Sequence, residues 1–218
     1  MMITIIIPTY NEEENILQIQ KDLDHLKGEF EVIFSDGFST DKTFEKIYYP
    51  KIQETKYRSN QMNRGAEYAK GDILWFVHGD SRISPESVLQ IERSGNEIGC
   101  FTLEFISAHP LMRMVAFNSS QRVKYRNIAF GDQGIFIKKK LFEEIGGFQP
   151  IPLMEDYQLS MTLKKKGYKF HLLKEKIRTS SRRFEEHGIW RTILKMQILQ
   201  HRYRRHGDIK KIYKDYGD

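Results

Sequence analysis

The sequence predicts an α/β fold in which helices flank a mixed, mainly parallel sheet. Short runs of β-branched residues alternate with stretches in which apolar residues recur every three or four positions, as they do in amphipathic helices. The first run, at 3–7, is apolar without interruption, which is typical of a strand buried on both faces of a parallel sheet. At 218 residues, 39% of them hydrophobic, the chain can bury a sizeable core and does not belong to the disordered classes.

The first part of the chain reads as three βα units. Asn11 follows the first strand and can cap a helix whose apolar residues share one face. The polar stretch 39–41 begins a second, short helix. A third helix at 60–70 ends at Gly71. The strands of these units are expected at 3–7, at 30–34, around Ile52 and at 73–78.

The second part mixes strands and helices less regularly. Ser84 and Pro85 open a helix, Gly146 and Gly147 form a turn, and Gly167 ends another helix. Because no stretch rich in Pro, Gly or Ser interrupts the chain, we expect a single domain over 1–218. Further strands are expected at 99–105, 135–137 and 168–173, and further helices at 111–125, 155–166 and 188–206.

Charge and cysteine content restrict the partners and the compartment. The net charge of +6 and the isoelectric point of about 9.2 suit a polyanion such as nucleic acid, an anionic lipid surface or a nucleotide diphosphate. The single cysteine, Cys100, excludes an internal disulfide, and no Cys/His cluster has the spacing of a zinc site. The apolar run 3–8 has no basic leader and is too short to cross a bilayer. We therefore expect a soluble protein of the reducing cytoplasm.

Polar residues follow three of the predicted strands, at 8–12, 35–39 and 78–80. In an open α/β sheet the loops after the strands meet beside one crevice, where ligands bind. Asp36 and Asp80 are the most informative of these residues, because a carboxylate at the end of a buried strand is costly unless a cation or a hydrogen-bond donor meets it.

Several enzyme classes are excluded, and a series of short motifs points to another. No glycine-rich phosphate loop, dinucleotide fingerprint, nucleophile elbow or zinc-protease helix is present. The motifs, over about 2–185, are IIIPTYNE at 5–12, DGFSTDKT at 36–43, GDILWFVHGD at 71–80, GDQG at 131–134, GGF at 146–148, LMED at 153–156 and SRRF at 181–184. Their order resembles the family 2 glycosyltransferases of the GT-A fold. The set looks most like a small bacterial subgroup without membrane spans, in which His-x-Asp replaces Asp-x-Asp.

The resemblance implies a nucleotide-sugar donor at the first two loops. Asp36 would accept a hydrogen bond from the base, with uracil favoured, and a turn-forming role is the alternative. The residues that would frame the base and ribose are Pro8, Thr9, Tyr10 and Glu12. Gln61 and Arg64, near the start of a helix, would meet the ribose or diphosphate, and a solvated helix face is their alternative. The family's usual second Asp is Gly37 here, and its Gly is Phe38.

The resemblance also implies a metal and two arginines at the diphosphate. Asp80 would coordinate Mg²⁺ or Mn²⁺, which bridges the two phosphates of the donor. We expect His78 to shape the loop or to bond a ribose hydroxyl rather than to bind the metal. Arg182 and Arg183 would hold the diphosphate, with a solvated basic strand end as the alternative.

Asp156, with Glu155 beside it, is implied as the catalytic group. On the family pattern Asp156 is the general base that takes the proton from an acceptor hydroxyl, and the single displacement inverts the anomeric configuration. A helix-capping role is the alternative for this pair.

The resemblance divides the domain into a nucleotide-sugar-binding half (1–105), an acceptor-side half (106–187) and a basic helical tail (188–218). We expect the apolar face of the tail helix to pack against the domain, with contact to an anionic membrane surface or a homodimer as alternatives. The residues that can share this face are Trp190, Ile193, Leu194, Ile198 and Leu199.

We therefore predict an inverting, metal-dependent glycosyltransferase that uses a nucleotide-diphosphate sugar, a UDP-sugar being favoured, and a saccharide, lipid-linked or small-molecule acceptor. It would be cytoplasmic, and peripheral at the inner face of the membrane if the tail binds lipid. Three hypotheses compete with this one. They are a sugar-1-phosphate nucleotidyltransferase, whose glycine-rich loop is missing; a basic module that binds anionic lipid or, as the partner we expect least, nucleic acid; and a relative that binds donors without turnover, suggested by His78.

Overall fold

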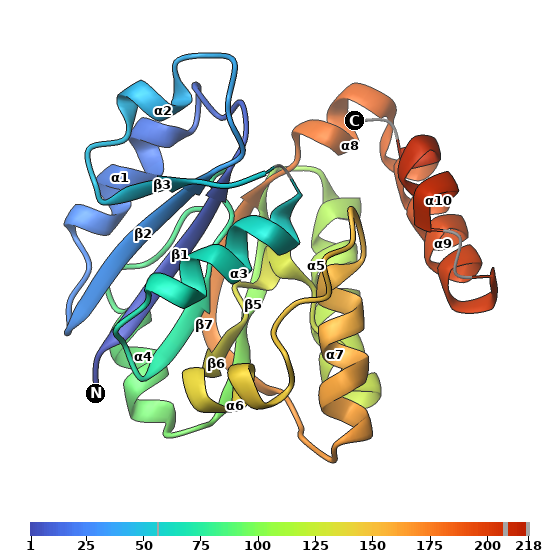
Figure 1. Cartoon of the computed structure of the whole chain (residues 1–218). Helices are drawn as coiled ribbons and strands as arrows, with labels where there is room; N and C mark the ends of the chain where they lie inside the picture. The colour runs from blue at the N-terminus through green and yellow to red at the C-terminus, as the bar shows by residue number, and fades with distance from the viewer. Residues whose placement is uncertain (56, 207–208, 217–218) are drawn as a thin grey trace.

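A seven-stranded sheet forms the centre of the computed structural model, which describes residues 1–55, 57–206 and 209–216 (Figure 1). The strand order is β3-β2-β1-β4-β6-β5-β7. β6 runs antiparallel to both of its neighbours, and the other pairs are parallel. The predicted mixed, mainly parallel sheet is confirmed. The strands are β1 (Ile3–Thr9), β2 (Phe30–Asp36), β3 (Lys51–Gln53), β4 (Ile73–Phe76), β5 (Ile98–Ile106), β6 (Phe136–Lys138) and β7 (His171–Ser180).

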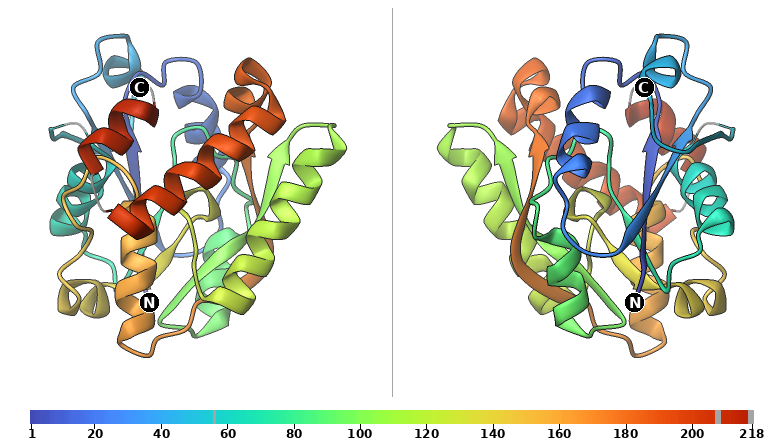
Figure 2. Two further views of the ribbon diagram at one scale, coloured as in Figure 1. Left: turned by 90° about the vertical axis from the view of Figure 1, so that its right-hand side faces the viewer. Right: turned by 90° about the vertical axis from the view of Figure 1, so that its left-hand side faces the viewer.

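Helices cover both faces of this sheet (Figures 1 and 2). One hydrophobic cluster joins α1 and α4 to one face, and another joins α3, α6 and α7 to the other. The helices are α1 (Ile16–Asp24), α2 (Thr43–Lys46), α3 (Arg58–Tyr68), α4 (Ser87–Ser94), α5 (Pro110–Arg126), the 3₁₀ helix η1 (Gly131–Gln133), α6 (Lys139–Glu144), α7 (Glu155–Lys165), α8 (Arg182–His187), α9 (Ile189–His206) and α10 (Ile209–Tyr216).

The first strand is buried along its whole length, as its apolar sequence predicts. Ile5 and Ile7 belong to the cluster under α1 and α4, whereas Ile6 belongs to the cluster under α3, because successive side chains of a strand point to opposite faces. Gly65 of α3 lies directly over Ile6. A Cβ atom on Gly65 would be 2.5 Å from Cγ2 of Ile6, so a glycine is needed for α3 to approach the sheet this closely.

The prediction that Asn11 caps the first helix is wrong. α1 begins at Ile16, and Asn11 adopts a left-handed backbone conformation with φ of +53°. Its side-chain oxygen accepts the backbone N–H of Thr40 at 2.9 Å. Asparagine tolerates this conformation better than most residues, so Asn11 serves as a link between two loops rather than as a cap.

The last strand is longer and starts later than predicted. The sequence suggested a strand at 168–173, whereas β7 covers His171–Ser180 and pairs with β5 at the edge of the sheet. β7 is half-exposed, and four charged residues interrupt its apolar sequence: Lys174, Glu175, Lys176 and Arg178. The continuous apolar run that marks a buried strand is therefore absent there. The helices α6 and α8 also lie outside the predicted elements, whereas α10 falls within the predicted helical tail.

The C-terminal helices pack on the start of α7 through a third hydrophobic cluster. Leu199 of α9 and Ile212 of α10 contact Met154 and its neighbours. The predicted apolar face of α9 is divided, which corrects the expectation that it packs as a whole: Leu199 is 2% exposed, whereas Trp190 is 65% exposed. Among the described helices, none has both the length and the apolar character needed to cross a membrane.

Candidate active site

The loops that follow β1, β2 and β4 meet at the carboxyl edge of the sheet, as predicted. Thr9, the last residue of β1, is in register with Asp36, the last residue of β2. The backbone N–H of Glu12 donates to Oγ1 of Thr43 at 2.8 Å and joins the first loop to the second. Gly79, in the third loop, packs against Glu12 and Thr9. The three polar loops therefore form one site.

The Asp36 carboxylate is buried and bonded within its own loop. Its Oδ2 accepts the backbone N–H of Ser39 at 2.9 Å, and its Oδ1 accepts the Ser39 hydroxyl at 2.5 Å and the Thr9 hydroxyl at 3.3 Å. These bonds fit the turn-forming alternative and occupy most of the lone pairs of the carboxylate. A direct contact between Asp36 and a nucleotide base stays a prediction.

The other residues predicted to frame the donor differ in their exposure. Pro8 and Thr9 are buried in the sheet, whereas Tyr10 is exposed and Glu12 is half-buried. Burial raises the pKa of the Glu12 carboxyl, a hydrogen bond from Asn15 at 2.7 Å opposes this, and the charge of Asp80 raises the pKa further. Two carboxyl groups thus repel each other at the ends of β1 and β4, an arrangement that a bound cation would relieve.

The α3 residues predicted to meet the ribose or diphosphate have protein partners. Gln61 is buried, and its Nε2 donates to the backbone oxygens of Thr9 and Ser35, both at 2.7 Å. The solvated-face alternative is therefore wrong for Gln61, which ties the ends of β1 and β2 together. Nη1 of Arg64 pairs with Glu67 at 2.6 Å on the surface of α3. Contacts of Gln61 and Arg64 with a donor stay predictions.

Phe38, in the loop after β2, combines a strained backbone with an exposed ring. Its φ is +58°, a left-handed conformation that costs an L residue about 1 kcal/mol. The ring is 55% exposed, and the adjacent Gly37 packs against Tyr10. A glycine would suit this backbone better, and strained residues of this kind cluster at functional sites. The exposed ring of Phe38, beside the donor loops, is therefore a candidate surface for stacking a nucleotide base.

Replacing Phe38 by Gly is expected to raise the free energy of unfolding by about 0.5–1 kcal/mol, because the left-handed strain disappears while little buried surface is lost. The same change should weaken UDP binding several-fold, by about 1 kcal/mol of lost stacking. Urea denaturation and calorimetric titration measure the two effects. Phe38→Ala is the matched control, since it removes the ring but keeps the strain. If Phe38→Gly were less stable than Phe38→Ala by about 0.5–1 kcal/mol, the ordinary entropic cost of a glycine, no strain would be stored at this position.

Asp80 and Arg182 line one cavity of about 220 Å³ beyond the end of β4. Burial raises the pKa of the Asp80 carboxyl, and the positive charges of Arg58 and Arg182 lower it in part. The predicted metal ligand and one of the two predicted diphosphate-binding arginines therefore share a site. Arg182 begins α8, two residues after the end of β7, and its side chain is exposed, so the alternative of a solvated basic residue stays open beside the predicted role. The side chain of Arg183 lies outside the part of the chain that the structure describes.

His78 lies in the loop of Asp80 and contacts the loop of Gly131, which in turn binds the Asp156 carboxylate. Burial, assisted by the charge of Arg58, lowers the pKa of the His78 imidazole to about 3, so the ring is neutral at physiological pH. The ring packs against Gly131, where a Cβ atom would be 2.6 Å from His78 Nε2. The Gly131 N–H in turn donates to Oδ2 of Asp156 at 2.8 Å. This contact agrees with the expectation that His78 shapes the loop.

Glu155 and Asp156 begin α7 in different surroundings. Glu155 is buried and pairs with Nε of Arg58 at 3.1 Å. Burial raises the pKa of the Glu155 carboxyl, the Arg58 charge opposes this, and the Asp156 charge adds to it. Asp156 is half-buried, and its Oδ1 accepts the N–H of Tyr157 at 2.6 Å. Of the pair, Asp156 is thus the carboxylate that an acceptor can reach.

Three charged residues of the site were given no role from the sequence: Arg58, Arg122 and Asp132. Oδ1 of Asp132 is buried and has no hydrogen-bond partner among the described residues. Burial raises the pKa of the Asp132 carboxyl to about 6. The charges of Asp156 and Asp80 also raise this pKa, whereas the charge of Arg122 lowers it. Asp132 falls within the GDQG motif, which could have indicated it. Arg58 and Arg122 lie on helices and belong to none of the motifs. Their place in the site is seen only from their partners, Glu155 for Arg58 and Asp132 for Arg122, which are distant in the sequence.

The side chains present fit a divalent cation that its substrate helps to hold. Within the described ranges, no three His, Cys, Asp or Glu side chains form a group that could hold a metal ion by themselves. Asp80 supplies one carboxylate beside an open cavity. Mg²⁺ and Mn²⁺ suit such a site, because they prefer oxygen ligands and accept water and phosphate oxygens in the remaining positions. Metal binding at Asp80 stays a prediction.

A mainly parallel sheet with one reversed strand, and carboxylates and arginines gathered beyond its carboxyl edge, agree with the predicted GT-A fold. The chain belongs to glycosyl transferase family 2, whose family model matches residues 4–146. This result agrees with the motif comparison and favours glycosyl transfer over the nucleotidyltransferase and the non-catalytic binding module.

Solved structures and curated relatives agree with this assignment. A mannosyltransferase from Pyrobaculum calidifontis, in complex with GDP-Man and Mn²⁺, aligns with a TM-score of 0.69 at 19% identity, covering 98% of this chain and 68% of that chain. The TarS fragment 1–349 from S. aureus, in complex with UDP-GlcNAc, aligns with a TM-score of 0.68 at 19% identity, covering 83% of this chain and 59% of that chain. At these identities the two structures show the fold.

Two curated proteins are similar in sequence. A dolichol-phosphate mannosyltransferase from Pyrococcus furiosus is 32% identical over 45% of this chain and 32% of its own length. An uncharacterized glycosyltransferase from Haemophilus influenzae is 29% identical over 74% of this chain and 62% of its own length. The chain thus spans about a third of the first relative and about three fifths of the second.

Proposed function

We propose that this glycosyltransferase moves a sugar from a nucleotide-diphosphate sugar to an acceptor hydroxyl with inversion, assisted by a divalent cation at Asp80. The observation that carries the proposal is the contact through His78. The ring of His78 packs against Gly131, and the N–H of Gly131 binds the carboxylate of Asp156. The Asp80 loop, proposed to bind the leaving diphosphate, and Asp156, proposed to activate the attacking hydroxyl, are therefore linked through His78 and Gly131. A single displacement requires these two groups to lie close together.

The donor is proposed to be a UDP-sugar bound over the loops after β1 and β2. Tyr10 and Phe38 are exposed there and offer aromatic surface for a base, while Asp36 keeps its loop folded through Ser39. The TarS fragment with a similar fold holds UDP-GlcNAc, and the Pyrobaculum enzyme holds GDP-Man. The choice of uracil rests on the motif resemblance and the first of these complexes.

At the diphosphate, Asp80 would hold Mg²⁺ or Mn²⁺, and Arg182 would bind phosphate oxygens from the other side of the cavity. The cation, when bound, neutralises the charge that develops on the departing diphosphate. Arg58 adds positive charge from α3, since its field acts on both Asp80 and Glu155. The chain itself thus supplies one metal ligand and a positive surround for the leaving group.

At the acceptor, Asp156 would accept the proton of the attacking hydroxyl. The N–H groups of Gly131 and Tyr157 fix both of its oxygens, and a carboxylate so bonded still has lone pairs for a third donor. Glu155 is buried and paired with Arg58. We assign Glu155 a positioning role at the start of α7 and Asp156 the role of general base.

Replacing Asp80 by Ala is expected to remove the metal-dependent part of donor binding. Mn²⁺ should strengthen the binding of UDP to the native chain about tenfold or more and leave its binding to the variant unchanged, because the single protein ligand is lost. A thermal-shift series of UDP, GDP and their sugars, with and without Mn²⁺, measures both the base preference and the metal effect.

Asp72→Ala is the matched control for this series. Asp72 lies just before β4, at the opposite edge of the sheet, and its Oδ2 accepts the N–H of Met2. The control makes the same change of charge and should keep the full metal effect. An equal response to Mn²⁺ in the native chain and in Asp80→Ala would contradict the proposed metal site.

A further inference from the structure

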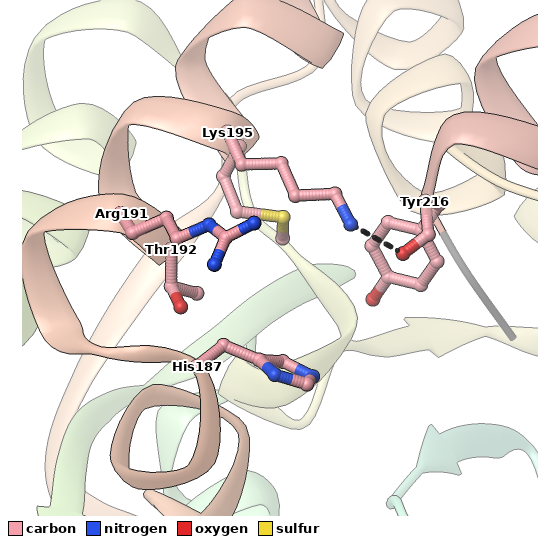
Figure 3. Close-up of a pocket in the computed structure, with 6 residues that line it drawn as sticks. His187, Arg191, Thr192, Lys195 and Tyr216 are labelled. Atoms are coloured by element: carbon pink, nitrogen blue, oxygen red, sulfur yellow. Dashed lines mark hydrogen bonds between the residues drawn. The ribbon is translucent and has the colours of Figure 1, made fainter.

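A second cavity, of about 270 Å³, lies among the three C-terminal helices (Figure 3). The last residue of α8, the first half of α9 and the last residue of α10 enclose it. The lining residues are His187, Arg191, Thr192, Lys195, Met196 and Tyr216.

This cavity is next to the candidate active site. Arg182 at the start of α8 lines the Asp80 cavity, and His187 at the end of the same helix lines the second one, a rise of about 8 Å along the helix. α9 reaches the catalytic helix as well, because the hydroxyl of Tyr203 donates to Gln158 of α7 at 3.0 Å. The helices that frame the cavity therefore contact both the diphosphate side and the acceptor side of the site.

Among the described residues, the lining includes Arg191 and Lys195 and no acidic side chain. Arg191 and Lys195 are one turn apart on α9, a spacing at which like charges destabilise a helix. Nζ of Lys195 donates to the backbone oxygen of Tyr216 at 2.9 Å (Figure 3). Further along α9, Arg202 pairs with Asp215 at 2.7 Å. Within the described residues, the exposed guanidinium of Arg191 has no such acidic partner.

Thr192 gives an independent observation. It is 4% exposed, and its Oγ1 has no hydrogen-bond partner in the part of the chain that the structure describes. A buried hydroxyl without a partner is unfavourable, and a threonine on a helix ordinarily bonds back to the preceding turn. Figure 3 shows Thr192 between Arg191 and His187 at the cavity. An oxygen of a ligand bound there would satisfy this hydroxyl.

We propose that this cavity binds a phosphate group of the acceptor. Arg191 and Lys195 would neutralise the phosphate, the Thr192 hydroxyl would donate to one of its oxygens, and Met196 would contact the carbon part of the molecule. A phosphate monoester offers three terminal oxygens and up to two charges, which matches this set of donors better than a carboxylate does. The inference rests on the proposed function, since it assigns a chemical class to the acceptor of that reaction.

Calorimetric titration of the full chain with phenyl phosphate tests the proposal. UDP and Mn²⁺ are titrated first, and phenyl phosphate is then added with the donor site filled. We expect one molecule to bind, benzoate to bind more weakly, and benzyl alcohol not to bind. Arg191→Gln should weaken phenyl phosphate binding about tenfold or more, and Thr192→Val about threefold, whereas Thr192→Ser, which keeps the hydroxyl, should restore it.

Arg204→Gln is the matched control, because Arg204 is an exposed arginine of the same helix that does not line the cavity. It should change the affinity less than about twofold. Equal weakening by Arg191→Gln and Arg204→Gln, or no weakening by Arg191→Gln, would overturn the proposal. So would loss of phenyl phosphate binding when UDP is present, because the probe would then occupy the donor site.

The same titrations separate this inference from the proposed function. If UDP does not bind but phenyl phosphate binds through Arg191, the phosphate site stands and the proposed transfer reaction fails. If UDP binds with Mn²⁺ and phenyl phosphate does not bind, the phosphate site fails and the transfer reaction stands.

The phosphate group belongs either to a soluble acceptor or to a lipid headgroup, and the exposed Trp190 distinguishes the two sources. Trp75 is buried, so a change in tryptophan fluorescence with vesicles reports mainly on Trp190. A blue shift with phosphatidylcholine vesicles that contain phosphatidic acid, absent with phosphatidylcholine alone and lost in Arg191→Gln, would indicate a lipid headgroup. Binding of phenyl phosphate without a response to either vesicle would indicate a soluble acceptor.

Discussion

Replacing Asp156 by Asn is expected to lower the rate of glycosyl transfer about a thousandfold while the affinity for the donor stays nearly unchanged. An amide keeps the size of the side chain and can still accept the N–H of Gly131, but it cannot take up the proton of the attacking hydroxyl. The expected result is therefore a fall in kcat with little change in the KM for the nucleotide sugar. Steady-state kinetics with the donor found in the thermal-shift series provides the measurement.

Two further measurements test whether the loss of activity in Asp156→Asn comes from the missing base and not from a change in folding. The thermal midpoint of this variant should fall only slightly, because the amide oxygen can keep one of the two backbone N–H contacts at the start of α7, whereas the NH₂ group cannot accept the other. Asp72→Asn, at the opposite edge of the sheet, makes the same chemical change and should leave kcat unaltered. A loss of donor affinity as large as the loss of kcat would contradict the role of general base.

Replacing Arg58 by Gln is expected to destabilise the fold by about 2 kcal/mol near pH 8. The substitution leaves the buried Glu155 carboxylate without its cation, and such losses reach about 3–5 kcal/mol for fully buried pairs. The smaller figure applies because the Arg58 side chain is partly exposed and water screens the pair. Urea denaturation of the two proteins at several pH values measures the difference.

The pH dependence of this loss has a definite sign. Burial holds the pKa of Glu155 above its ordinary value of 4.5, and removal of Arg58 raises it further. In the variant, the folded state keeps a proton that the unfolded state releases as the pH rises above about 4.5. Below about pH 7, the pKa of Glu155 in the native chain, both folded states keep this proton and the two proteins change in stability alike. The free energy of unfolding of the variant therefore falls relative to the native chain only above about pH 7, and at pH 4 the two proteins should differ little.

The double variant Arg58→Gln/Glu155→Gln isolates the ion pair. Because a neutral amide replaces the carboxylate, most of the stability lost in Arg58→Gln should return at pH 8, and the dependence on pH should disappear. A loss of stability that is the same at pH 4 and pH 8, or that persists in full in the double variant, would show that Arg58 acts through contacts other than Glu155.

The parts of the fold that the sequence predicted are those with strong local patterns. β1 and β4 are apolar runs buried on both faces, and α5 and α9 are long helices close to their expected bounds. The errors lie where tertiary contacts replace local signals. β7 is a half-exposed edge strand with several charged residues in place of an apolar run, and Asn11 bonds to Thr40 instead of to its own helix.

In the candidate site, too, residues marked by a local pattern could be predicted, and residues that depend on tertiary contacts could not. The loops after β1, β2 and β4 were expected to meet, because parallel strands end at one edge of a sheet. Asp80 could be identified from its place after a strand and from the family motifs. Asp156 could be identified from the family motifs alone. The structural role of Gln61 could not be predicted, since its partners, the backbone oxygens of Thr9 and Ser35, belong to two other strands.

The sequence by itself determined the α/β sheet, the order of its first units and membership of glycosyl transferase family 2, because these depend on hydrophobic periodicity and on short motifs that each lie within one stretch of chain. Only the tertiary structure decided that Arg58 pairs with Glu155, that His78 rests against Gly131 beside Asp156, and that three helices enclose a basic cavity with an unpaired threonine hydroxyl. These features join residues that are distant along the chain. Their charges and hydroxyls acquire a partner, or lack one, only when folding brings the elements together and removes the water between them.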